Sequence, residues 1–160
     1  MKTVGALQVT TPSEREVALT RVFDAPRRMV FDCYTRPELV KRWAGGPPGW
    51  RMLSCEIDLR VGGVWHWVTE SPDGQRMGYG GVYLEVVAPE RLVSTEVFDE
   101  PWYEGEAVSR LEFVEHAGQT TLTTTVRYAS QAVRDAVLQS PMAEGMAYGL
   151  EQLAAVLRAL

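Results

Sequence analysis

The sequence has little of the side-chain chemistry from which metal and redox sites are built. Its 160 residues include two cysteines, Cys33 and Cys55, and two histidines, His66 and His116. Neither cysteine belongs to a Cys-x-x-Cys pair, and a zinc site needs about four ligands in a tight constellation. We therefore expect two free thiols in a reducing compartment, with no metal and no cofactor.

Positive charge is also scarce, because 16 lysine and arginine residues stand against 21 aspartate and glutamate residues, a net charge of -5. Binding to a phosphate backbone normally needs a basic face, so a nucleic-acid partner is not expected. No apolar run approaches the ~20 residues that span a bilayer, and residues 1–12 lack the apolar stretch of a secretion signal. These absences predict a cytoplasmic protein without membrane insertion.

Short catalytic motifs are missing as well. The chain contains no Gly-x-Ser-x-Gly elbow, no phosphate loop and no dinucleotide-binding glycine fingerprint. The run Gly78-Tyr79-Gly80-Gly81 is rich in glycine, but it interrupts a predicted strand instead of opening a helix. Function therefore has to be inferred from the fold and from the residues that the fold brings together.

What the sequence does contain is apolar and polar alternation, broken by turn residues about every ten positions. Its length fits one domain, which we assign to residues 14–160 behind a loose lead-in at residues 1–13. Ser71-Pro72-Asp73-Gly74 has the residue chemistry of a hairpin turn. The predicted strands span residues 16–23, 50–59, 64–70, 76–87, 91–98, 107–115 and 119–128.

Helical patterns flank this run of strands. Two short helices are expected after the first strand, one capped by Asp24 and extending to Thr35, the other beginning after Pro37 and stopped by the Gly/Pro-rich residues 44–49. Residues 131–139 and 141–160 form the last two predicted helices. The final helix alone is long enough to cover an apolar sheet face. The pattern thus predicts an α+β fold, a curved antiparallel sheet wrapped around a long C-terminal helix.

The C-terminal helix combines an apolar stripe with two glycines. Gly145 and Gly149 lie four residues apart, and so on one side of the helix. Glycine inside a helix costs up to ~1 kcal/mol relative to alanine, so a packing reason is expected. The glycines either leave a gap beside the helix or let its backbone approach the sheet closely. The apolar stripe consists of Met142, Met146, Leu150, Leu153, Val156, Leu157 and Leu160.

Two tryptophans occupy one face of a predicted strand. Trp65 and Trp67 alternate with His66, so both indoles project to the same side and the histidine to the other. Inward-facing indoles can line a cavity and stack on a flat ligand, or they can fill the core. His66 is accordingly expected on the outer face.

Glu96 is the candidate acid or base. If Leu92 and Phe98 point inward, Glu96 enters the interior as an unpaired carboxylate, which would raise its pKa. The opposite register buries Val93 and Val97 and leaves Glu96 in water. The strand that holds Tyr83 has the same ambiguity, and alternation alone leaves both registers open.

Several short motifs follow one another along the chain in a recognisable order. They are Arg42-Trp43, Gly46-Pro47, residues 58–65, Asp73-Gly74, residues 81–86, residues 89–93 and Gly145-Met146. Together they resemble the activator of Hsp90 ATPase homologue-like family, a branch of the START-like superfamily that also includes Bet v 1-like and polyketide cyclase proteins. The resemblance extends over roughly residues 16–160. It implies the helix-grip fold and a cavity in which superfamily members bind lipids, sterols, polyketides or hormones.

Three functions fit these observations. The first is binding of a small hydrophobic, aromatic or lipid-like molecule between the sheet and the C-terminal helix. The second is a cyclase- or hydrolase-like enzyme in which Glu96 acts as general acid or base and Tyr83 polarises a carbonyl. The third is a homodimer or cochaperone-like module that uses an outer face carrying Val64, His66 and Val68. The candidate ligand-binding residues are Trp43, Trp65, Trp67, Tyr83, Glu96, Phe113, Met146, Gly149, Leu150 and Leu153.

Overall fold

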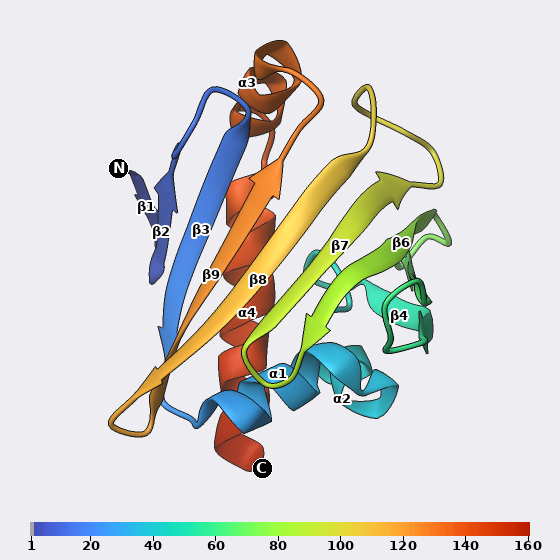
Figure 1. Ribbon diagram of the computed structural model, residues 1–160. Helices are drawn as coiled ribbons and strands as arrows, with labels where there is room; N and C mark the ends of the chain where they lie inside the picture. The colour runs from blue at the N-terminus through green and yellow to red at the C-terminus, as the bar shows by residue number, and fades with distance from the viewer. Residues whose placement is uncertain (1) are drawn as a thin grey trace.

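The computed structural model describes residues 2–160, within which nine strands form one antiparallel sheet in the order β1-β2-β3-β9-β8-β7-β6-β5-β4. The sheet curves around the long helix α4, as Figure 1 shows, which is the predicted α+β helix-grip architecture. The strands are β1 (Lys2–Val4), β2 (Leu7–Thr10), β3 (Glu16–Phe23), β4 (Arg51–Ile57), β5 (Val64–Glu70), β6 (Arg76–Val87), β7 (Arg91–Phe98), β8 (Ala107–His116) and β9 (Gln119–Arg127).

Helices cover the concave side of the sheet. Helix α4 (Met142–Ala159) crosses behind the strands, and α1 (Arg27–Thr35) and α2 (Pro37–Trp43) lie near the end of the sheet opposite α3 (Gln131–Gln139) (Figure 1). Within residues 2–160 no helix combines the length and apolarity needed to cross a lipid bilayer. The elements that can enclose a cavity are α1, α2, α4 and the concave sheet face.

The prediction of a loose lead-in is wrong for residues 2–10, which form the hairpin β1–β2 at the edge of the sheet; residue 1 lies outside the described residues. Strand β2 pairs with β3 through Gln8 and Thr20. Leu7 and Val9 are buried, whereas Gln8 and Thr10 are exposed. Four alternating residues give too short a signal to detect, but docking beside β3 supplies the missing backbone partners.

Two predicted details at helix and strand ends also need correction. Helix α1 begins at Arg27 with Pro26 as its N-cap residue, and no side chain caps it, so Asp24 does not have the predicted role. Asp24 lies two residues before that cap, too early to accept a hydrogen bond from the first turn. Strand β4 is shorter than its predicted span and begins at Arg51. The predicted boundaries of β3, β5, β6, β7 and α3 are confirmed.

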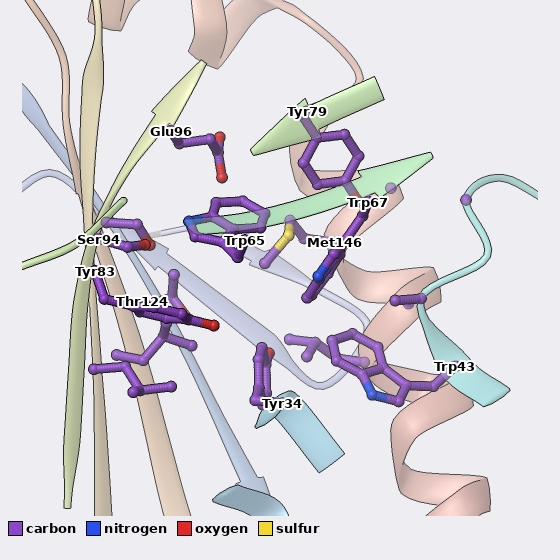
Figure 2. Close-up of a pocket in the computed structure, with 18 residues that line it drawn as sticks. Tyr34, Trp43, Trp65, Trp67, Tyr79, Tyr83, Ser94, Glu96, Thr124 and Met146 are labelled. Carbon is purple, nitrogen blue, oxygen red and sulfur yellow. The ribbon is translucent and has the colours of Figure 1, made fainter. Parts of the chain in front are cut away.

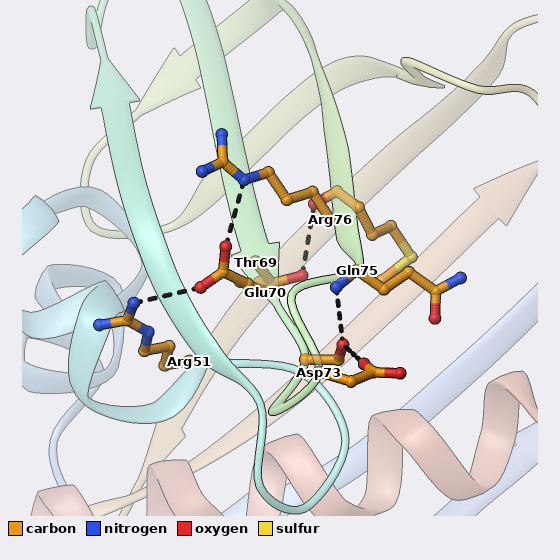
Figure 3. Close-up of polar contacts among 8 residues, drawn as sticks. Arg51, Thr69, Glu70, Asp73, Gln75 and Arg76 are labelled. Carbon is orange, nitrogen blue, oxygen red and sulfur yellow. Dashed lines mark hydrogen bonds and ion pairs between the residues drawn. The ribbon is translucent and has the colours of Figure 1, made fainter.

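The hairpin between β5 and β6 is fixed by polar contacts around Glu70 (Figure 3). The carboxylate accepts hydrogen bonds from Arg51 on β4 at 3.1 Å and from Arg76 on β6 at 3.2 Å. These bonds, that from Arg51 first, hold the pKa of Glu70 below its usual range. In the turn itself the Ser71 hydroxyl accepts from the backbone N–H of Gln75 at 2.9 Å. Three strands are thus tied together at the edge that carries most of the aromatic side chains described next.

Candidate functional site: an aromatic cavity beside the C-terminal helix

A cavity of about 210 Å³ lies between the concave sheet face and α4. Its walls come from α1, α2, α4 and strands β5 to β9, and Figure 2 shows the side chains that point into it. Apolar and aromatic groups make up most of the lining. The expected void between the sheet and the terminal helix is therefore present.

Three aromatic rings from neighbouring strands form one wall. Trp65 and Trp67 on β5 both face inward, and Tyr79 on β6 lies opposite Trp67 in the ladder. The centroid of Trp65 is 5.4 Å from that of Trp67 and 6.0 Å from that of Tyr79, and all three ring pairs meet edge to face. This arrangement is favoured by the ring quadrupoles, and it aims ring faces in several directions.

Trp43 supplies a second wall from α2. Its indole N–H donates to the backbone carbonyl of Cys33 at 2.8 Å. In a continuous helix that carbonyl would accept from residue 37, but Pro37 has no N–H. Trp43 therefore satisfies an orphaned acceptor, and this bond fixes its ring 6.2 Å from that of Trp67 and 4.8 Å from that of Tyr34.

The two glycines of α4 open onto this space. A Cβ atom built on Gly145 would have no neighbour within 4 Å, and one built on Gly149 would meet only Cζ3 of Trp43, at 4.0 Å. The gap interpretation is therefore confirmed, and the alternative of close backbone approach to the sheet is wrong. Met146 and Leu150, from the same helix, also line the cavity.

Glu96 adopts the inward register on β7, together with Leu92 and Ser94. The other predicted register is wrong, because it would bury both Val93 and Val97, and Val97 is 41% exposed although Val93 is buried. Burial raises the pKa of the Glu96 carboxyl to about 7. Among residues 2–160 no side chain forms a hydrogen bond or ion pair with this carboxylate. Figure 2 shows it projecting toward the space beside Trp65 and Tyr79.

Hydroxyl groups complete the polar part of the lining. Burial raises the pKa of Tyr34, Tyr79 and Tyr83, so these phenols stay protonated at neutral pH and can donate hydrogen bonds. Of these tyrosines only Tyr83 was a sequence candidate. Tyr79 lies on the same face of β6 as Tyr83, so counting residues along the strand could have identified it as well. Ser94 shares the face of Glu96 on β7 and was left out of the candidates. Ser109, Thr124 and Tyr34 were also missed, because nothing in a helix or strand pattern marks a hydroxyl as facing a cavity.

Two sequence candidates do not line the cavity. Phe113 is only 1% exposed and packs edge to face against Phe31, with ring centroids 5.4 Å apart, and against Tyr34. Leu153 is fully buried one turn beyond Leu150. Both predictions are wrong for the same reason: toward this end of α4 the helix closes on α1 and the sheet, and apolar side chains fill the space. The remaining eight candidates line the cavity.

The outer face of β5 carries the other predicted set. His66 faces outward, as expected, and its Nε2 lies 2.9 Å from an oxygen of Asp99. Val64 is 55% exposed, whereas His66 and Val68 are half-buried. Within the described part of the chain no group of three or more His, Cys, Asp or Glu residues could hold a metal ion. A partner or second copy on this outer face stays a prediction.

Comparison with known proteins places the chain among relatives of the same architecture. A protein from Rhodobacter sphaeroides is 30% identical, with a TM-score of 0.91 over 97% of this chain and 99% of its own. A protein from Nitrosomonas europaea is 25% identical, with a TM-score of 0.81 over 93% and 97%. The AHSA1 protein from Silicibacter pomeroyi, 23% identical with a TM-score of 0.73 over 90% and 98%, shares the fold.

A search of curated proteins gives no match. The family model described as "Activator of Hsp90 ATPase homolog 1-like protein" matches residues 24–158, which extend from before α1 to the last turn of α4. The order of motifs that suggested this resemblance is thus supported by sequence and by structure. The chain belongs to the activator of Hsp90 ATPase homolog 1-like family, within the START-like superfamily.

Proposed function

We propose that the protein binds a small hydrophobic molecule, with an aromatic ring or a short lipid-like chain, in the cavity beside α4. The observation that supports this most directly is the open, aromatic-walled space next to Gly145 and Gly149. Ligand sites are commonly concave, mostly apolar and equipped with a few polar groups that fix orientation. Here Glu96, Ser94 and the tyrosine hydroxyls are those polar groups.

The size of the cavity restricts the guest. An apolar protein cavity of about 150 Å³ can hold benzene. With about 210 Å³, this cavity accommodates a molecule of one or two rings, or a chain of similar volume, without rearrangement. A sterol would require α4 or α2 to move. The edge-to-face rings already hold one another in place and form a preformed surface for flat molecules. Because these side chains lose little conformational freedom when a ligand binds, the entropic cost of binding is small.

Titration of tryptophan emission with a panel of one- and two-ring compounds tests this proposal, with calorimetry as a second measurement. Three of the five tryptophans line the cavity, so a bound guest should change their emission. Gly149→Leu is the blocked control, because the new side chain would extend into the open space beside Trp43. If no compound changes emission or gives heat at micromolar concentrations, the proposal fails.

A second candidate function is general acid–base catalysis by Glu96. A carboxyl group with a pKa of about 7 is well matched to proton transfer near neutral pH, and this one faces the proposed guest. The hydroxyl of Tyr83, which also lines the cavity, could polarise a carbonyl of a bound substrate. The test compares the wild type with Glu96→Gln for turnover of any compound that binds. Turnover that survives this substitution would rule out the catalytic role.

A further inference from the structure

Of the residues between 2 and 160 that line the cavity, Glu96 is the only one with a formal charge. No lysine or arginine is present to receive an anionic guest. A carboxylate in such a setting repels a fatty acid or another carboxylate and attracts a cation. Because the cavity is walled by apolar groups, solvent screens this interaction less than it would at the surface.

The walls around Glu96 are themselves suited to a cation. Trp65, Trp67 and Tyr79 surround the same part of the cavity with ring centroids between 5.4 and 6.0 Å apart. The indole N–H groups of Trp65 and Trp67 are buried, without partners, away from accessible space. The surface that these indoles offer to a guest is consequently the carbon π system, which attracts positive charge at its face.

We propose that the guest is a hydrophobic amine, whose protonated nitrogen lies between the Glu96 carboxylate and the rings of Trp65, Trp67 and Tyr79. This inference rests on the proposed function, since it specifies the chemical class that the same cavity accepts. The apolar part of the amine would extend toward Trp43 and Gly149, where the walls carry no charged group. Aromatic faces attract ammonium groups, and a carboxylate beside them adds the attraction of an opposite charge.

The protonation of Glu96 makes this preference depend on pH. The carboxyl has a pKa of about 7, raised by burial. The titratable groups that feel its charge are Tyr79 on β6, Tyr103 between β7 and β8, and Tyr128 after β9. Burial raises the pKa of all three, so they remain neutral between pH 6 and pH 8. An aliphatic amine stays protonated over that range, so its binding should strengthen as Glu96 ionises.

The experiment uses three naphthalenes that carry an aminomethyl, a hydroxymethyl or a carboxylate group at the same ring position. Their dissociation constants are measured by calorimetry at pH 6 and pH 8. We expect the amine to bind at least about tenfold more tightly than the alcohol at pH 8, and the carboxylate to bind more weakly than both. The advantage of the amine over the alcohol should shrink at pH 6.

Glu96→Gln should remove the preference for the amine while leaving the alcohol bound. Glu104→Gln, which removes the same charge from an exposed loop residue, is the matched control and should leave the preference unchanged. Trp67→Leu should weaken binding of the amine more than Trp67→Phe does, because only phenylalanine keeps an aromatic face. Circular dichroism and thermal melting verify that each variant is folded.

The two proposals fail differently. If the alcohol and the amine bind equally well to the wild type, or if Glu96→Gln retains the preference, the amine inference is overturned while the cavity remains a ligand site. If none of the three compounds binds the wild type, the proposed function fails, and the amine inference fails with it.

Discussion

Gly149 on α4 faces Trp43 on α2 at the edge of the cavity: a Cβ atom built on the glycine would lie 4.0 Å from Cζ3 of the indole and would have no other neighbour within 4 Å. That separation is ordinary van der Waals contact. The pair marks where the C-terminal helix stops short of its neighbours. The residue at position 149 therefore affects the stability of α4 through its helix propensity, and the free volume of the cavity through its size.

Gly149→Ala should stabilise the protein by about 0.5–1 kcal/mol, since alanine is a better helix former than glycine and its methyl group causes no clash. Urea unfolding measures the change. Gly149→Leu should instead abolish binding of the hydroxymethyl naphthalene while the far-ultraviolet circular dichroism spectrum stays native. A destabilised alanine variant would show that position 149 is already tightly packed.

Trp67→Ala should cost less than about 3 kcal/mol in free energy of unfolding, because the indole is half-buried and borders open space. Phe113→Ala is the comparison within the packed core. Its ring is enclosed by Phe31 and Tyr34, and the substitution should cost about 3–5 kcal/mol. Equal costs for the two variants would contradict the placement of Trp67 at a cavity wall.

Trp43→Phe should destabilise the protein by about 1–3 kcal/mol, because it leaves the Cys33 carbonyl buried without the donor that Pro37 also fails to supply. Trp102→Phe serves as the control. Trp102 is 48% exposed, and its substitution should change stability by less than about 0.5 kcal/mol. Denaturant unfolding of both variants measures the two changes in free energy of unfolding. If Trp43→Phe destabilises the protein no more than Trp102→Phe does, the hydrogen bond to Cys33 does not have this role.

Stability should fall between about pH 4.5 and pH 7 because of Glu96. Its carboxyl group has a pKa of about 7 in the folded protein and one near 4.3 in the unfolded chain. The folded state therefore binds the proton more tightly in this interval, and raising the pH removes that contribution. The loss is at most about 4 kcal/mol.

Glu96→Gln isolates this contribution from every other titrating group. We expect the variant to be more stable than the wild type at pH 8, and the difference between the two proteins to shrink toward pH 5. Urea unfolding at several pH values measures both. A difference that does not change with pH would show that the carboxyl group does not titrate in this range.

Much of the fold follows from patterns visible along the chain. The strand from Val64 to Glu70 could be predicted from its alternation and from the turn residues beside it, and the final helix from its apolar stripe. The glycines of that helix predicted either free space or a close backbone approach, and only the structure decided for free space. The hairpin of residues 2–10 escaped detection, because its four-residue strand depends on a neighbour across the sheet instead of on its own pattern.

The site was only partly foreseeable. Trp65 and Trp67 could be paired on one face by counting, but the same counting left two registers for Glu96. Nothing in the sequence indicated that Tyr34 faces the cavity, because an aromatic residue on a predicted helix is assigned to the core until its neighbours are known. Phe113 and Leu153 were assigned to the cavity because apolar character does not distinguish a filled space from an empty one.

The sequence by itself determined the order of strands and helices from β3 onward, the placement of two tryptophans on one strand face and the position of two glycines on the last helix, because these depend on local patterns. Only the tertiary structure decided that Glu96 faces the interior, that the Trp43 indole replaces the N–H which Pro37 lacks, and where the core ends and the cavity begins. Such features depend on distances between segments far apart in the chain, and local sequence patterns do not determine those distances.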